Sequence, residues 1–97
     1  MIDVEIAAAA AADLDEIFRF SLDRFGEERA SRYLDDITHA ILRLREYPDS
    51  GMLYRDTAPP VRYASCGSHR IFYTRRQHGL LVIRILHQAM RTRGRLS

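Results

Sequence analysis

The sequence predicts an α+β domain in which an antiparallel sheet carries a pair of helices on one face. Residues 2–6 alternate apolar and polar side chains, which is typical of a half-buried strand. Residues 8–47 carry two apolar stripes at helical spacing, and residues 61–87 hold three β-rich runs. The predicted order is therefore β-α-α-β-β-β, in a single domain that spans residues 1–97.

The two helices are expected to pack as an antiparallel αα-hairpin. The first is predicted from about Ala8 to Phe25, where Gly26 breaks the pattern. The second begins at Glu27, whose charge suits a first helical turn, and ends before Pro48. Because only Gly26 separates the helices, we expect them to lie side by side. The first stripe consists of Leu14, Ile17, Phe18, Leu22 and Phe25, and the second of Ala30, Tyr33, Leu34, Ile37, Ala40, Ile41 and Leu44.

The later strands are predicted to be antiparallel, after a loop at residues 52–60, with the first strand at an edge of the sheet. A three-residue connection at 77–79 would pair Arg76 with Leu80 and Phe72 with Arg84, whereas a two-residue loop would bury an unpaired arginine. In that register one face is apolar and meets the helices, and the other is open and rich in arginine. The helix-facing side chains are then His69, Ile71, Tyr73, Leu81, Ile83, Ile85 and His87. The open-face side chains are Arg70, Phe72, Thr74, Arg76, Val82 and Arg84.

Charge is divided unequally between the two halves of the chain. Residues 1–56 hold seven arginines against all 13 acidic side chains, which leaves a net charge of −6. Residues 57–97 hold eight arginines and no acid, a net charge of +8. This asymmetry favours a negatively charged partner for the second half, and attraction between the two halves is the alternative explanation.

The composition argues against several other classes of protein. Cys66 is the single cysteine, so it predicts neither an internal disulfide nor a multi-cysteine metal site. The histidines of the second half lie nine residues apart, so we expect no metal and no cofactor. The longest apolar run, residues 80–86, is too short to span a membrane, and acidic residues precede the alanines at 7–12. We therefore expect a cytoplasmic protein with no membrane partner.

A catalytic alternative comes from the histidines of the last two strands. Cleavage of RNA through its 2′-hydroxyl needs a base, an acid and cations near the phosphate. His69, Tyr73, Arg84 and His87 would supply these groups in a ribonuclease. A histidine at a strand end beside an apolar core is more often a hydrogen-bonded structural residue, and the chain has no lysine to act as a base. We therefore predict no catalytic residue in the favoured interpretation.

Several short motifs occur in a set order along the chain. They are Asp-Leu-x-x-Ile at residues 13–17, Pro48-x-x-Gly51, His69-Arg70-Ile71-Phe72-Tyr73 and Ile85-Leu86-His87-Gln88-Ala89-Met90. Together with the β-α-α-β-β-β order, they resemble the ParE toxins of bacterial type II toxin–antitoxin modules, in the RelE/ParE superfamily. The family pattern commonly continues from the last Met to Asp, whereas Arg91 follows here.

The resemblance implies a toxin that a ParD-like antitoxin neutralises and that, when released, inhibits DNA gyrase. Growth inhibition and plasmid stabilisation would be the consequences. RelE relatives cut messenger RNA on the ribosome, so a ribosome-dependent mRNA endoribonuclease is the alternative function. A third possibility is an inactive remnant that only binds its antitoxin. We expect a protein inhibitor rather than an enzyme, a hetero-oligomer with the antitoxin, and no direct DNA binding without it.

The cationic second half is predicted to meet both partners. An acidic antitoxin segment that folds on binding would complement its charge. The predicted antitoxin-binding residues are Arg62, Arg70, Phe72, Arg76, Val82 and Arg84. The residues predicted to act on gyrase are His87, Met90, Arg91, Arg93 and Arg95, in a tail expected to form one cationic helical turn or to fray.

Overall fold

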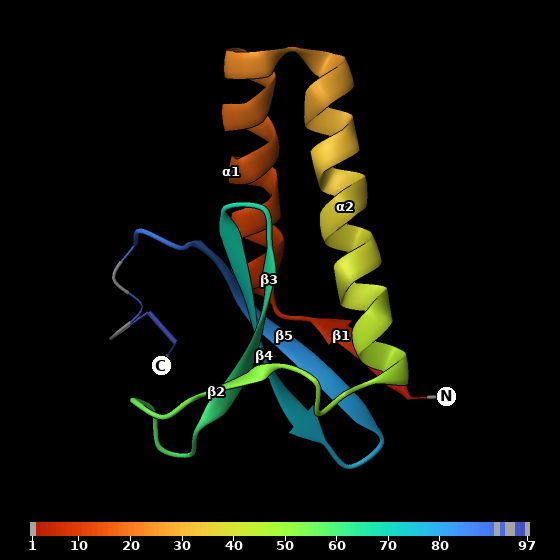
Figure 1. Ribbon diagram of the computed structural model, residues 1–97, viewed down its shortest axis with the longest axis vertical. Helices are drawn as coiled ribbons and strands as arrows, with labels where there is room; N and C mark the ends of the chain where they lie inside the picture. The colour runs from red at the N-terminus through yellow and green to blue at the C-terminus, as the bar shows by residue number, and fades with distance from the viewer. Residues whose placement is uncertain (1, 91, 93–94, 97) are drawn as a thin grey trace.

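A pair of helices stands on one face of a five-stranded sheet in the part of the chain that the structure describes, residues 2–90, 92, 95 and 96 (Figure 1). The structure is a computed structural model of the 97-residue chain. Its elements are β1 (Asp3–Ile6), α1 (Ala8–Phe25), α2 (Glu27–Glu46), β2 (Met52–Tyr54), β3 (Val61–Cys66), β4 (His69–Arg76) and β5 (Gly79–His87). The predicted α+β class and the bounds of both helices are confirmed.

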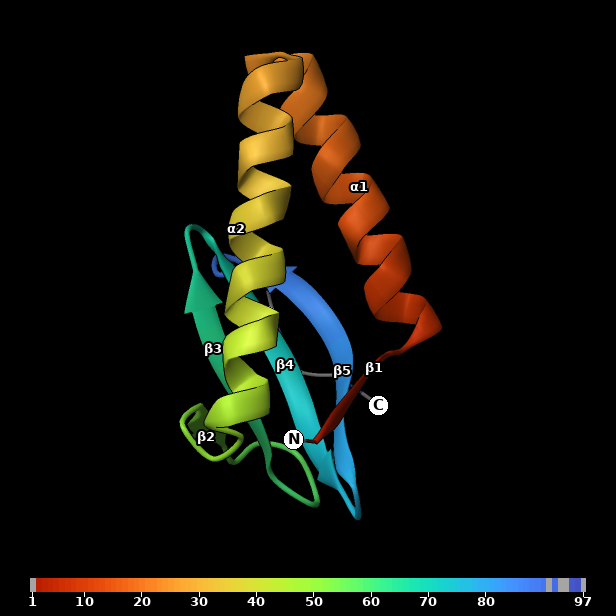
Figure 2. The same ribbon diagram turned by 90° about the vertical axis from the view of Figure 1, so that its right-hand side faces the viewer.

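The helices form the predicted αα-hairpin, and the end at which they are joined stands clear of the strands (Figures 1 and 2). Gly26 makes the connection with φ of +86°, a left-handed conformation that glycine adopts without a steric cost. Glu27 and Glu28 in the first turn of α2, with Arg43 and Arg45 in its last turn, complement the helix dipole. Neither helix, within the described residues, is apolar over a long enough stretch to cross a membrane.

The sheet is mixed, which corrects the antiparallel prediction. Its strand order is β1-β5-β4-β3-β2, and β1 runs parallel to β5 with Val4 opposite Leu80. The other strand pairs are antiparallel, and β1 lies at an edge as predicted. The predicted loop at residues 52–60 is partly wrong, because Met52–Tyr54 pairs with β3 as the opposite edge strand. Three residues are too few for a period-two pattern to emerge from the sequence.

The register of the β4–β5 hairpin differs from the prediction near its turn. Arg76 pairs with Gly79 rather than with Leu80, so the loop contains two residues. Farther along the hairpin, Tyr73 pairs with Val82 and Phe72 pairs with Arg84, so Ile83 has no partner on β4 and forms a bulge. The pairing of Phe72 with Arg84 is the predicted one. This bulge shifts side-chain alternation by one residue along part of β5. As a result, Val82 packs in the helix-side core and Ile83 packs on the other face, each opposite to its predicted position.

Both faces of the sheet carry apolar clusters. On the helix side, Ile71, Tyr73 and Ile85 pack in one cluster with Ile37 and Ile41 of α2, as predicted from the sequence. The opposite face was predicted to be open, but it holds a second cluster. That cluster consists of Val61, Phe72 and Leu86, with Tyr54, Tyr63, Ile83 and Leu96 partly buried against it. The short strand β2 and the end of the chain thus cover part of the surface that was expected to be free.

The far half of α1 departs from its predicted stripe. Leu22 and Phe25 were expected to be buried, but they are 39% and 52% exposed, and Phe20 is 58% exposed. The buried line of α1 instead runs through Ala10, Asp13, Ile17 and Ser21. Because this end of the hairpin extends past the sheet, no strand lies beneath it to cover the aromatic side chains (Figure 2).

Candidate functional site

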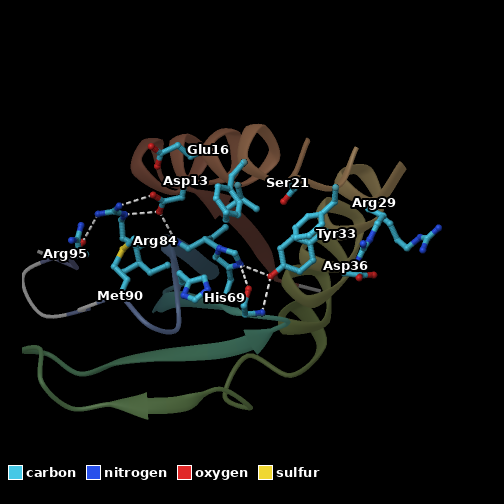
Figure 3. A pocket seen from close by; sticks show the side chains of 18 residues that line it. Asp13, Glu16, Ser21, Arg29, Tyr33, Asp36, His69, Arg84, Met90 and Arg95 are labelled. Carbon is cyan, nitrogen blue, oxygen red and sulfur yellow. Dashed lines mark hydrogen bonds and ion pairs between the residues drawn. The ribbon is translucent and has the colours of Figure 1, made fainter. Parts of the chain in front are cut away.

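A groove of about 890 Å³ lies between the helical hairpin and the end of the sheet (Figure 3). Helices α1 and α2 form two of its sides, and the ends of β4 and β5 with the following tail form the third. Its lining residues are Asp13, Glu16, Ile17, Phe20, Ser21, Phe25, Arg29, Arg32, Tyr33, Asp36, Ser68, His69, Arg84, Ile85, Leu86, His87, Met90 and Arg95. A groove of this size on so small a domain is the natural candidate for a binding site.

The half of the groove beside the helices is apolar and aromatic. Phe20 and Phe25 are more than half exposed, and each is covered by a guanidinium. The Arg24 guanidinium carbon lies 5.0 Å from the Phe20 ring centre, and that of Arg29 lies 4.8 Å from the Phe25 ring centre. Ser21 is 6% exposed between them, and its hydroxyl points into the groove (Figure 3). This wall offers aromatic surface, positive charge and one hydroxyl to an incoming segment.

An ion pair between Asp13 and Arg84 closes the opposite end. The Asp13 carboxylate accepts from Arg84 Nε at 2.8 Å, from Arg84 Nη2 at 2.9 Å and from the Ile85 backbone N–H at 2.8 Å. These bonds raise the pKa of Arg84 above its ordinary value. Asp13 is only 8% exposed, and a buried charge left without its partner costs about 3–5 kcal/mol. The prediction that Arg84 lies free on an open face is therefore wrong, because a helix carboxylate holds it.

A hydrogen-bonded aromatic cluster forms the floor between α2 and the sheet. The Tyr33 hydroxyl lies 2.6 Å from His69 Nδ1, accepts the Ser68 N–H at 3.2 Å and lies 3.1 Å from the Cys66 carbonyl. The His69 and His87 rings meet edge to face with centres 5.3 Å apart. Burial lowers the pKa of His69 below its ordinary value, and His87 lowers it further. His69 is thus a neutral, hydrogen-bonded residue, and it lies on the helix-facing side of the sheet, as predicted.

The structure separates the residues predicted to bind antitoxin. Phe72 and Val82 are 0% exposed in the two cores, so neither offers surface to a partner. Arg62 donates to the Gly51 carbonyl at 2.8 Å and holds the turn after α2. Arg70 lies over the Tyr63 ring at 4.7 Å, on the face away from the helices. Arg76 is exposed at the β4–β5 turn, far along the strand from Arg70. Only Arg84 of this set lines the groove.

The four residues of the ribonuclease alternative are not brought together. His69 and His87 are in ring contact, and Arg84 lies near them on β5. Tyr73, however, is 0% exposed, and its hydroxyl donates to the Pro48 carbonyl and accepts the Gly51 N–H. Burial raises the pKa of this hydroxyl, which disfavours its ionised form. Within the described residues, no three His, Cys, Asp or Glu side chains are grouped so as to hold a metal ion.

Two described residues near the end of the chain, Met90 and Arg95, line the groove. Met90 lines the groove and is 40% exposed, and its N–H donates to the His87 carbonyl at 2.9 Å. The Arg95 carbonyl accepts from Arg84 Nη1 at 3.0 Å, and Leu96 packs in the second cluster. Arg91 and Arg93, which were also predicted to act on gyrase, lie outside the described residues.

Several groove residues were missed by the reasoning from sequence. Phe20 lies off the predicted apolar stripe of α1, and single apolar residues are common on protein surfaces, so the sequence alone does not mark it as part of a site. Arg29 and Arg32 were assigned no role. Their role as a groove wall depends on how far the hairpin extends beyond the sheet, which periodicity does not report.

The fold of two helices on a mixed five-stranded sheet also occurs in a solved chain from a bacterial toxin–antitoxin system. A chain of the solved chromosomal ParDE TA system from P. aeruginosa shares the fold, with a TM-score of 0.78 and 22% identity over 90% of this chain and 96% of that chain. The family model of the ParE toxin of the type II toxin–antitoxin system, parDE, matches residues 4–92. The chain belongs to this ParE toxin family.

Curated relatives agree with that membership. Toxin ParE1 of Mycobacterium tuberculosis H37Rv is 38% identical over 86 residues, which cover 88% of each chain. Toxin ParE1 of Caulobacter vibrioides is 34% identical and covers 95% of each chain. Toxin ParE of Escherichia coli is 33% identical over 95% of this chain and 90% of its own length. The resemblance that the motifs indicated is thereby confirmed.

Proposed function

We propose that this ParE-family toxin is held inactive by a ParD-like antitoxin lying in the groove, and that the released toxin inhibits DNA gyrase. The observation that carries the antitoxin half of the proposal is the groove itself. It has an exposed aromatic wall at Phe20 and Phe25 and arginines on both sides. An isolated soluble protein rarely leaves such a surface uncovered.

The groove fits the apolar face of an amphipathic segment. The stretch of α1 from Asp13 to Phe25 lines its length, and twelve helical steps of 1.5 Å give about 18 Å. That length matches about three turns of a partner helix laid in the groove. Arg29 and Arg32, on the α2 side of the groove, would face acidic residues that flank the apolar face of the partner. The partner is thus an amphipathic segment with acidic residues beside its apolar face.

Replacing the aromatic wall tests the docking site. Phe20→Ala and Phe25→Ala should each weaken antitoxin binding by about tenfold or more, as central aromatic anchors of an interface do. Calorimetric titration of the purified toxin with its antitoxin measures the effect. Because both side chains are more than half exposed, their removal should leave the melting temperature nearly unchanged. Leu42→Ala is the matched control, since Leu42 is 45% exposed on α2 but does not line the groove. Equal losses in Leu42→Ala and the two groove variants would refute the groove as the docking site.

Supercoiled plasmid cleavage tests the gyrase half. Purified toxin should increase the linear DNA formed by gyrase, and prior addition of the antitoxin should abolish the increase. No linear product at saturating toxin, with growth still arrested in cells, would contradict the gyrase assignment. Codon-phased cuts in messenger RNA under the same conditions, abolished by His87→Ala, would establish the ribonuclease alternative instead. Unaffected growth after expression without antitoxin would indicate an inactive remnant.

A further inference from the structure

Arg84 is the one residue on β5 whose described hydrogen bonds reach both α1 and the end of the chain. Its Nε and Nη2 atoms donate to Asp13 on α1, and its Nη1 atom donates to the Arg95 carbonyl at 3.0 Å. Figure 3 shows these bonds side by side, with Arg84 between Asp13 and Arg95. The helix and the tail are thus joined through a single guanidinium.

The geometry of the guanidinium explains why both bonds form together. Its donors lie in one plane in a fixed fork, so engaging the Nε–Nη2 edge with a carboxylate sets the direction of Nη1. Asp13 is itself fixed by the Ile85 N–H at 2.8 Å and is 8% exposed. A lysine at the same position would have one mobile ammonium, which cannot hold the carboxylate in a bidentate contact and still direct a donor at the tail.

The tail has a second anchor on the other face of the sheet. Leu96 packs against the cluster of Val61, Phe72 and Leu86, while Met90 lines the groove on the helix side. Met90 and Leu96 thus lie on opposite faces of the sheet, and Arg84 bonds to Arg95, the neighbour of Leu96. The Arg84–Arg95 bond adjoins the Leu96 contact, so loss of either anchor should loosen the other.

We propose that Asp13 and Arg84 form a positioning pair that seats the C-terminal segment, and that Arg84 affects toxicity through this seat. The inference rests on the proposed function and on the prediction from sequence that the end of the chain acts on gyrase. It reassigns Arg84 from a free docking cation to a residue whose guanidinium is already committed on both edges. Asp13, which was not among the predicted site residues, becomes the positioning residue that orients it.

Amide hydrogen exchange tests the seat directly in the full-length toxin. Arg84→Lys and Asp13→Asn should speed exchange of the Arg95 N–H, which donates to the Thr92 carbonyl, by about tenfold. The Gln88 N–H, which donates to the Ser68 carbonyl, should exchange at its original rate in the same sample. Arg75→Lys is the matched control, because Arg75 also pairs with an aspartate but has no described contact with the tail. Unchanged Arg95 exchange in both variants would overturn the proposal, as would equal acceleration at Gln88, which reports general loosening. Asp13→Asn keeps an acceptor for Ile85, so one informative variant remains if the other folds poorly.

A double-mutant cycle separates positioning from a merely structural role. Arg84→Lys and Leu96→Ala should each reduce gyrase-dependent cleavage by about tenfold. The double variant should show about the same tenfold loss, because either substitution alone already releases the C-terminal segment from its position. A loss of about a hundredfold in the double variant would mean that the residues act independently, and it would overturn the inference. If wild-type toxin produces no cleavage at all, the proposed function fails, while the exchange experiment still decides whether the pair seats the tail.

Discussion

Asp13 shows how a single residue changes meaning once the fold is known. In the sequence it appears on the polar side of the first helix. In the structure it is 8% exposed and accepts three hydrogen bonds from Arg84 and Ile85. Its partner lies 71 positions away along the chain, so no local pattern predicts the pair. A buried charge in a folded protein has such a partner, because an unpaired one is too costly.

His69 gives a pH prediction at the same scale. Burial and the nearby His87 lower its pKa in the folded state, so the unfolded chain binds a proton more readily. The free energy of unfolding should therefore fall as pH drops from about 7 through the ordinary histidine pKa of about 6.5, with a slope of at most about 1.4 kcal/mol per pH unit from this group. Urea unfolding between pH 5 and 8 measures it.

Two variants isolate the contribution of His69. His69→Gln should reduce the pH dependence of stability, whereas His78→Gln, at the exposed β4–β5 turn, should leave it as in the wild type. A pH dependence in His69→Gln equal to that of the wild type would assign the effect to other groups.

At the scale of elements, local signals located the helices well and the hairpin poorly. Both helices have their predicted bounds, because caps, breakers and periodicity act within a few residues. The β4–β5 register depended on a bulge that places Ile83 out of step with the strand. A two-residue loop was rejected from the sequence because, with regular alternation along both strands, it would bury an unpaired arginine. The bulge breaks that alternation, and Arg84 is paired with Asp13, so the two-residue loop buries no unpaired arginine.

The β3–β4 turn offers a test of element packing. Gly67 has φ of +55°, and an added Cβ would lie 2.6 Å from the Tyr33 ring. Gly26 also has positive φ but has nothing within 4 Å of an added Cβ. Gly26→Ala should cost about 1–3 kcal/mol through the backbone alone, because φ of +86° with ψ of 171° is a region open essentially to glycine only. Gly67→Ala should cost more than the about 1–2 kcal/mol of its own left-handed backbone, because it also displaces Tyr33 from His69. Chemical denaturation of both variants measures these costs, and a Gly67→Ala cost within its backbone range would show that Tyr33 yields without penalty.

At the scale of the whole molecule, the charge asymmetry is partly used within the fold. Asp13 pairs with Arg84, and Asp49 lies within 4 Å of both Arg62 and Arg75. Attraction between the two halves, the alternative explanation from sequence, therefore accounts for some of the arginines. The arginines beside the exposed aromatic rings, Arg24 and Arg29, belong to the acidic first half, so the asymmetry does not concern them.

Salt dependence distinguishes the groove from the opposite face as the antitoxin site. Added salt should weaken the toxin–antitoxin complex, mainly by slowing association, because screening acts on exposed charges. Arg29→Gln with Arg32→Gln should lower affinity and flatten the salt dependence. Arg19 lies on α1 outside the groove lining, so Arg19→Gln is the control for the removal of one positive charge, to be compared with Arg29→Gln alone. A larger effect from Arg70→Glu than from the Arg29 and Arg32 pair would restore the face away from the helices as the docking surface.

By itself the sequence determined the α+β class, both helices, the edge position of the first strand and the family, because these depend on local periodicity and on short ordered motifs. Tertiary structure alone decided the parallel pairing of β1, the bulge in β5 and the Asp13–Arg84 pair. It also decided that Phe20 and Phe25 face a groove rather than a core. The physical reason is range: helix formation is settled among neighbours three or four positions apart, whereas a groove and an ion pair depend on which distant surfaces the packed elements leave together.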